Sequence, residues 1–303
     1  MDVSIILVSY NTKDLTKNCL KSIFEKTQDL NFDVWIVDNA SKDGSIEMIE
    51  EEFPWVKLIE SNENLGFGRA NNLAIRKTDA KYVFLLNTDT ILVNNAIKIL
   101  FDLMEKPENN NVACCGGQLF NEDLSLQTSY ADFPTLKNLF LKSFGLNIVS
   151  RINRFRYLHK KKSLSGNNGQ QNINQDVDII IGADMLLRKS ALEKAGLFNE
   201  RFFLYFEEAE LCFKLKKHGF KIIYIPEAQI VHLCGKSTEK EKPITVEKLF
   251  KTGEILFFDA CYGKTAGQLA KLLFIIYYTR YFFLRFFSPK AFQRVLMVSS
   301  IKV

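Results

Sequence analysis

Short apolar runs alternate with amphipathic segments along the first third of the chain. The apolar runs predict buried strands at residues 3–8, 32–37, 56–59 and 82–86. Apolar residues at helical spacing predict intervening helices at 15–24, at 46–53, in a segment ending near Lys77, and at 94–104. Strands and helices that alternate in this way form βαβ units. The pattern therefore predicts an α/β fold with a mostly parallel sheet flanked by helices.

The same pattern continues further along the chain, after an irregular middle. It predicts strands at 112–117, 178–188 and 222–225, a short helix from Ser190 to Gly196, and a helix at 211–218. Pro226 is expected to end the strand before it. Residues 160–175 are polar and low in complexity, so we expect a mobile loop there, either disordered or folding over a bound ligand.

Polar clusters follow the expected strands. In a parallel sheet the carboxyl ends of the strands share one edge, where open α/β sheets bind ligands. We expect four clusters on that edge: Tyr10-Asn11, Asp38-Asn39, residues 64–72 and Asn87-Thr88-Asp89. An aspartate after a strand is also a common turn former or helix cap, so this alternative for Asp89 stays open.

The composition is that of a globular protein, and its positive charge is unevenly placed. Of 303 residues 47% are hydrophobic and 25% charged, with a net charge of +5. Residues 236–303 hold 12 Lys and Arg against 5 Asp and Glu, whereas residues 1–235 hold 28 against 30. The main body therefore lacks the basic face that nucleic-acid binding requires.

The cysteines and the N-terminal residues indicate a reducing compartment. None of the six cysteines forms a Cys-x-x-Cys pair, and most lie in apolar runs, which is typical of buried free thiols. No basic segment precedes the apolar run at residues 3–8, and that run is too short for a signal peptide. We expect a cytoplasmic protein.

Two further features are candidates for chemistry. Glu207, Glu208 and Glu210 begin a helix after five large apolar residues. Acids in a first turn stabilise the helix dipole, but acids next to an apolar segment also suit a general base. His232 follows a strand. Two interpretations stay open for it, a structural histidine or a metal ligand. The chain has no dinucleotide fingerprint at residues 66–71, no P-loop and no Gly-x-Ser-x-Gly motif.

Six motifs occur in order along the chain. They are Val8-Ser9-Tyr10-Asn11, Asp38-Asn39-x-Ser41-x-Asp43-Gly44-Ser45, Asn64-x-Gly66-x-x-x-Ala70-Asn71, Leu86-Asn87-x-Asp89, Phe206-Glu207-Glu208-x-Glu210-Leu211-Cys212 and Pro226-Glu227-Ala228-x-Ile230-Val231-His232. This series, which covers about residues 3–235, resembles the family 2 glycosyltransferases of the rhamnosyltransferase-like kind.

The resemblance implies a GT-A fold and an inverting transfer from a nucleoside-diphosphate sugar, UDP- or dTDP-linked. It also implies a divalent metal, Mg²⁺ or Mn²⁺, held at Asp89 and His232. The sugar would be rhamnose or another deoxyhexose, and the product a cell-surface polysaccharide. Carried over by position, the residues that would bind the donor are Ser9, Tyr10, Asp38, Arg69, Asn87 and Asp89.

The same carry-over makes Glu208 the catalytic base and places Asp184 and Glu207 near the acceptor. Two positions depart from the family pattern. Asn87 replaces the first acid of Asp-x-Asp, and Glu208 stands where Asp is usual. These departures leave open a protein that binds sugar nucleotides without transferring sugar. A nucleotidyltransferase would need a basic, Gly-rich loop after the first strand, and residues 9–12 do not provide one.

The last part of the chain differs in character. We expect a catalytic domain at residues 1–235 and a helical, basic-aromatic extension at residues 236–303. Eight of the twenty residues from Gln268 to Phe287 are aromatic, and Lys271, Arg280 and Arg285 interrupt the run. Such a helix fits the plane of an anionic membrane surface, here the cytoplasmic face of the inner membrane, beside a glycan or lipid-linked acceptor. The alternative is a helix packed on the catalytic domain.

Overall fold

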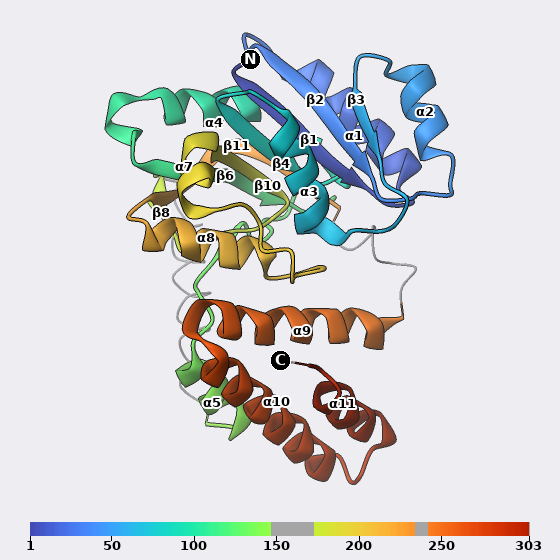
Figure 1. The fold of residues 1–303 in the computed structure, drawn as a ribbon, viewed down its shortest axis with the longest axis vertical. Helices are drawn as coiled ribbons and strands as arrows, with labels where there is room; N and C mark the ends of the chain where they lie inside the picture. Colours follow the sequence, from blue (N-terminus) through green and yellow to red (C-terminus); the bar gives the residue numbers. More distant parts are fainter. Residues whose placement is uncertain (147–172, 234–241, 303) are drawn as a thin grey trace. The chain divides into compact units, whose positions relative to one another are not determined.

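The computed structural model describes residues 1–146, 173–233 and 242–302. The chain divides into two compact units, each made of two segments. Unit 1 comprises Met1–Phe133 and Asn174–Lys242, and unit 2 comprises Pro134–Ile173 and Pro243–Val303 (Figure 1). The boundary predicted at residue 235 and nearly all of the loop predicted at 160–175 lie outside the described residues.

A mixed, mostly parallel sheet forms the centre of unit 1 (Figure 1). Its strands are, in spatial order, β3 (Lys57–Glu60), β2 (Phe32–Asp38), β1 (Val3–Ser9), β4 (Tyr82–Leu86), β10 (Asp184–Arg188), β6 (Val112–Phe120), β11 (Lys221–His232) and β5 (Thr90–Leu92), with β8 (Gln175–Asp176) beside β11. β7 (Tyr130–Ala131) and β9 (Ile179–Ile180) form a separate pair. Strands β1 to β4 are mutually parallel, and β10 runs antiparallel to β4.

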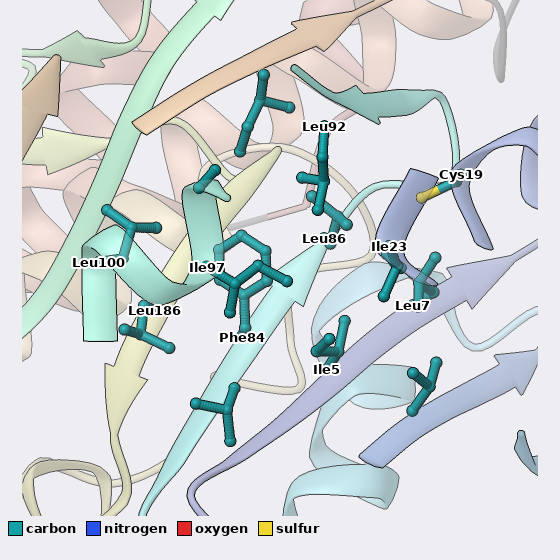
Figure 2. Close-up of a cluster of buried hydrophobic side chains, with 14 of the residues drawn as sticks. Ile5, Leu7, Cys19, Ile23, Phe84, Leu86, Leu92, Ile97, Leu100 and Leu186 are labelled. Carbon is teal, nitrogen blue, oxygen red and sulfur yellow. The ribbon is translucent and has the colours of Figure 1, made fainter. Parts of the chain in front are cut away.

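Helices cover both faces of this sheet. They are α1 (Lys13–Lys26), α2 (Ser45–Glu52), α3 (Gly66–Lys77), α4 (Ala96–Glu105), the short η1 (Pro107–Asn109), α7 (Lys189–Ala195) and α8 (Glu207–Lys217). The apolar faces of α1, α2 and α4 share one buried cluster with alternate residues of the central strands, including Ile5, Leu7, Phe84 and Leu186 (Figure 2). Full burial of each such side chain stabilises the fold by about 1.5–3 kcal/mol.

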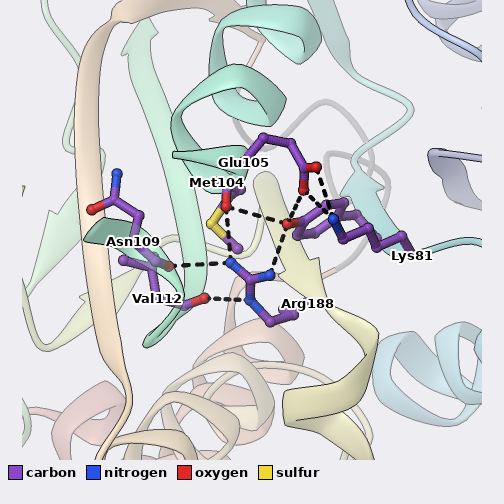
Figure 3. Close-up of polar contacts among 7 residues, drawn as sticks. Lys81, Met104, Glu105, Asn109, Val112 and Arg188 are labelled. Carbon is purple, nitrogen blue, oxygen red and sulfur yellow. Dashed lines mark hydrogen bonds and ion pairs between the residues drawn. The ribbon is translucent and has the colours of Figure 1, made fainter. Parts of the chain in front are cut away.

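A network of hydrogen bonds surrounds Arg188 at the C-terminal end of β10. This end lies away from the polar clusters that follow the parallel strands. Arg188 donates hydrogen bonds to the hydroxyl of Tyr82 at 2.8 Å and to the carbonyl of Val112 at 2.9 Å, and so joins β10 to both neighbours (Figure 3). Tyr82 in turn donates to Glu105 at 2.6 Å. The network fixes the register in which Arg188 pairs with Tyr82 and Asp184 with Leu86. It therefore places Asp184 at the carboxyl end of β4.

Two of the predicted strands differ from those in the structure, which also adds the short strands β5, β7 and β8. β11 continues through Pro226, because its register with β6 shifts between Ile225 and Gln229, and a proline is tolerated at such an irregularity. The single strand predicted at 178–188 is instead β9 and β10, separated by a turn at residues 181–183.

Unit 2 is helical in its described residues. Its helices are α5 (Leu136–Ser143), α9 (Pro243–Tyr262), α10 (Lys264–Leu284) and α11 (Pro289–Ser299). Phe258, Leu273, Phe274 and Tyr278 lie in its apolar core, so part of the aromatic content of α10 packs within this unit. Among the described helices, none combines the length and the apolar character needed to cross a bilayer.

Candidate active site

The carboxyl ends of β1 and β2 bring two buried polar side chains together. Ser9 pairs with Asp38 in the parallel register, and both are fully buried. The backbone N–H of Ser41 donates to Asp38 Oδ1 at 2.7 Å. Asp38 Oδ2 has no hydrogen-bond partner among the described residues. A buried oxygen without a partner is uncommon, and it suits an N–H donor on a ligand such as a uracil or thymine ring.

The loop that leads into α3 is hydrogen-bonded to the segment that follows β2. Asn39 donates from Nδ2 to the Gly66 carbonyl at 3.1 Å. Gly66 has φ +77°, and a Cβ there would lie 2.1 Å from the carbonyl oxygen of Phe203, so only glycine fits. Arg69 follows in the first turn of α3, partly exposed and 3.7 Å from Glu63. Tyr10 is 41% exposed. Both side chains are accessible to a ligand.

Asp89 and His232 face each other at the carboxyl ends of β4 and β11. Asp89 Oδ1 lies 3.4 Å from His232 Nε2, and Asp89 is only 2% exposed. The N–H of Leu233 donates to the carbonyl of Asp89 at 2.8 Å. These contacts bring together two residues that are far apart in the sequence.

Gln127 determines which nitrogen of His232 carries the proton. Its Nε2 donates to the His232 carbonyl at 3.1 Å, and its Oε1 lies 2.7 Å from His232 Nδ1. Because the amide oxygen can only accept, Nδ1 must donate. In the neutral ring, the lone pair of Nε2 therefore faces the Asp89 carboxylate. Two acceptors in this arrangement suit a divalent cation.

Other ligands would have to complete such a site. Within the described parts of the chain, no group of three His, Cys, Asp or Glu side chains could hold a metal ion. Asn87 lies two residues before Asp89, and its N–H donates to the Ala183 carbonyl at 3.0 Å. Mg²⁺ and Mn²⁺ commonly take one or two protein ligands together with phosphate oxygens and water. The pair of Asp89 and His232 fits that pattern.

Glu208 lies in the first turn of α8, next to the turn that begins β10. A Cβ at Gly182 would be 3.6 Å from the Cβ and Cγ of Glu208. Burial raises the pKa of the Glu208 carboxyl. Tyr205 and Phe206, just before α8, both have positive φ, at 73° and 70°. Such backbone is costly for residues with a Cβ and is concentrated at functional sites.

The two carboxylates predicted to contact the acceptor are both buried. Burial, and then the charge of Glu208, raise the pKa of Glu207 well above its usual range. Asp184 has no exposed surface; its Oδ2 accepts from the Gly117 N–H at 2.6 Å, and its Oδ1 has no partner among the described residues. The predicted acceptor role of Asp184 stays a prediction, and it would require neighbouring side chains to withdraw.

Most of the residues predicted for the site therefore share one edge of the sheet. The Asn87–Ala183 hydrogen bond and the closeness of Gly182 to Glu208 connect the aspartate motif to α8, and Asp89 contacts His232. Gln127 was not among the predicted residues. It lies in an irregular segment 105 residues from His232, and no local pattern marks it.

Comparison with known proteins identifies the family. The family model described as glycosyl transferase family 2 matches residues 4–196. The chain is 25% identical over 248 residues to the N-acetylglucosaminyl-diphospho-decaprenol L-rhamnosyltransferase of Mycobacterium tuberculosis, covering 78% of each chain. It is 26% identical over 238 residues to the rhamnosyltransferase WbbL of Escherichia coli K12, covering 76% of this chain and 83% of that protein.

Solved structures show the same fold. The mannosyltransferase PcManGT of Pyrobaculum calidifontis, in complex with GDP-Man and Mn²⁺, aligns with a TM-score of 0.56 and 16% identity over 99% of this chain and 73% of that one. GalNAc-T7, with UDP, GalNAc and Mn²⁺, aligns with a TM-score of 0.60 and 12% identity, covering 86% of this chain and 48% of that one. The fold is of the GT-A type, as predicted. The chain belongs to glycosyl transferase family 2 and is a glycosyltransferase.

Proposed function

We propose that this enzyme transfers rhamnose or another deoxyhexose from a nucleoside-diphosphate sugar to a glycan or lipid-linked glycan, with inversion at the anomeric carbon. The observation that carries the proposal is the buried pair of Asp89 and His232 on the same edge of the sheet as Glu208. The proposed sugar rests on the two relatives, both of which are rhamnosyltransferases.

The donor would be dTDP- or UDP-linked. The unpaired Asp38 Oδ2 would accept the ring N–H of thymine or uracil, while Ser41 holds the other carboxylate oxygen. Because Asp38 is fully buried, donor binding would have to move the residues that cover it. Ser9 is buried beside Asp38, and the side chains of Tyr10, directly after β1, and Arg69, in the first turn of α3, are exposed. A guanidinium suits the diphosphate because it pairs with phosphate oxygens.

Asp89 and His232 would hold a Mg²⁺ or Mn²⁺ ion, with Asn87 at most a supporting group. Such an ion, when bound, neutralises the negative charge that develops on the leaving diphosphate. Gln127 keeps His232 Nδ1 protonated, so Nε2 is available as a ligand. Asp89 supplies the negative charge that the asparagine at position 87 lacks.

Glu208 would act as the general base. The acceptor hydroxyl is a poor nucleophile, and the Glu208 carboxylate takes its proton as the oxygen attacks the anomeric carbon. The bond from that carbon to the diphosphate oxygen breaks on the opposite side, and the nucleoside diphosphate departs with the bonding electrons. This single displacement inverts the configuration. The raised pKa makes ionised Glu208 a stronger base than an exposed glutamate.

The proposed acceptor class rests on the M. tuberculosis relative, which is named for an acceptor with a diphospho-decaprenol lipid. We infer a lipid-linked glycan precursor of a cell-surface polysaccharide, extended at the cytoplasmic face of the membrane. Glu207 and Asp184 are the proposed acceptor-side residues. Both are buried in the described conformation, so acceptor binding would have to open the region around them.

The test is transfer by the purified chain. dTDP-rhamnose and UDP-sugars are incubated with a diphospho-lipid-linked sugar, with MnCl₂, MgCl₂ or EDTA, and nucleoside diphosphate release is measured with the anomeric configuration of the product. We expect metal-dependent release from one donor class and an inverted product. Lack of turnover with both donor classes, or a retained configuration, contradicts the proposal.

A further inference from the structure

The turn that joins α10 to α11 carries an exposed group of large apolar side chains. Figure 1 shows this turn at an extremity of unit 2. Phe286 is 92% exposed, the highest fraction among the large hydrophobic residues that the structure describes. The other strongly exposed members of this group, which we name the aromatic tip, are Phe283, Leu284, Phe287 and Phe292.

The aromatic tip is distinct from the core of unit 2. The buried positions of α10 end at Tyr278, several residues before the turn. Beyond that point the rings contact one another: Phe283 and Phe287 have centroids 5.6 Å apart, and Phe282 lies 5.2 Å from Phe287. Phe286 and Phe287 both have positive φ, at 49° and 63°, which residues with a Cβ seldom adopt. Packing within unit 2 therefore does not account for these exposed side chains.

The charge around the aromatic tip has one sign. No Asp or Glu occurs from residue 260 to the end of the sequence. The nearest acid in the sequence is Asp259 on α9, which is buried. On the same helix Glu247 pairs with Arg294 and Glu254 with Lys251. Within the described residues, Arg285 and Lys290 have no carboxylate partner. The turn thus presents apolar rings and unneutralised cations together.

This combination fits an anionic lipid bilayer. Phenylalanine and leucine side chains gain free energy at the boundary between headgroups and acyl chains, while arginine and lysine extend to the lipid phosphates. We propose that the aromatic tip inserts into the interfacial region of an anionic bilayer, with Arg285 and Lys290 at the phosphate groups. The inserted part is the α10–α11 turn, and α10 itself contributes its buried face to unit 2.

Vesicle flotation tests the proposal with the full chain. Phosphatidylcholine vesicles with and without phosphatidylglycerol are used, without donor or metal. We expect binding only to the anionic vesicles, weakened by salt. The double variant Phe286→Ser, Phe287→Ser should bind at least about 10-fold more weakly, because two large side chains no longer leave water. The matched control is Phe140→Ser, Phe144→Ser, which removes two other exposed phenylalanines of unit 2.

A second variant gives a direct readout of insertion. In Phe286→Trp, brominated anionic lipids should quench the fluorescence of the new tryptophan. They should not quench the fluorescence of Trp35 and Trp55, which both belong to unit 1. Equal binding of wild type and tip variant, or equal loss in the control, overturns the proposal. So does a wild-type dimer that the tip variant converts to a monomer without any vesicle binding. The assay contains no donor, so its failure would leave the proposed sugar transfer unaffected.

Discussion

His232 Nε2 lies 3.4 Å from Asp89 Oδ1, and the two residues come from strand ends that are 143 positions apart. Gln127 Oε1 accepts a hydrogen bond from Nδ1 of the His232 ring, so the lone pair on Nε2 faces the Asp89 carboxylate. A divalent cation between these two acceptors would be held by both of them. In a family 2 glycosyltransferase, this makes the pair the proposed metal site.

Asp89→Asn keeps the size of the side chain and removes its charge. Loss of an outer-shell group typically lowers metal affinity or activity by about 10- to 100-fold, and we expect a larger fall here in both Mn²⁺ affinity and sugar transfer. Isothermal titration calorimetry in the presence of the nucleoside diphosphate measures Mn²⁺ affinity, and product formation measures transfer. Asp123→Asn, on an exposed loop of the same unit, is the control. Unchanged Mn²⁺ binding in Asp89→Asn would remove this residue from the metal site.

Gln127→Leu should weaken Mn²⁺ binding by about 10- to 100-fold, because the His232 ring loses the acceptor that fixes its tautomer. Gln127→Glu retains an acceptor for Nδ1 and should recover part of the affinity. Electron paramagnetic resonance of added Mn²⁺ measures binding independently of turnover. Gln28→Leu removes an exposed amide of unit 1 and should have no effect. Equal Mn²⁺ affinities of Gln127→Leu and Gln127→Glu would show that the acceptor is irrelevant.

Asp38→Asn should weaken UDP and dTDP binding by about 10- to 100-fold, because an amide N–H would face the N–H of the base. The remaining amide oxygen still accepts from Ser41, so the fold should be kept. Nucleotide titration measures the change. Asp33→Asn at the opposite end of β2 is the control. If GDP and UDP binding fall equally in Asp38→Asn, the residue does not read the base.

Glu208→Gln should lower kcat by about 100- to 10,000-fold, the usual contribution of a general base, and leave donor affinity unchanged. Glu47→Gln removes an exposed first-turn carboxylate of α2 and controls for the helix dipole. Normal turnover in Glu208→Gln would refute the assignment of the base.

The pH profile gives an independent check of the same residue. The base must be ionised, and burial raises its pKa above the usual 4.5, so wild-type kcat/KM should rise with pH along a limb that lies above that value. The residual activity of Glu208→Gln should lack this limb. A limb of unchanged position in the variant would assign it to another group.

Asp184→Asn should stabilise the protein at neutral pH. Burial raises the Asp184 pKa well above 3.8, so the folded state holds a proton that the unfolded state releases, and stability falls as pH rises between the two pKa values. An asparagine oxygen can still accept from the Gly117 N–H. We expect Tm to rise by about 2–4 °C, or about 1 kcal/mol, near pH 7. The gain should shrink toward pH 4, and a gain independent of pH would exclude titration of Asp184 as its cause.

Local pattern determined much of this protein. Residues 82–86 are predicted and found as a buried strand, because an apolar run bounded by polar residues specifies its own burial. The aspartate, glutamate and histidine motifs could be found for the same reason: each lies at a strand end or helix start that the sequence marks. The family followed from their order along the chain.

Long-range packing decided the rest. No local pattern shows that Gln127 contacts His232, that β11 continues through Pro226, or that Asp184 is enclosed by its neighbours. Aromatic residues occur throughout the segment 274–292, but some lie in the core of unit 2 and others on the exposed turn between α10 and α11. Periodicity states which face of an element is apolar, but which residues cover that face depends on segments distant in the sequence.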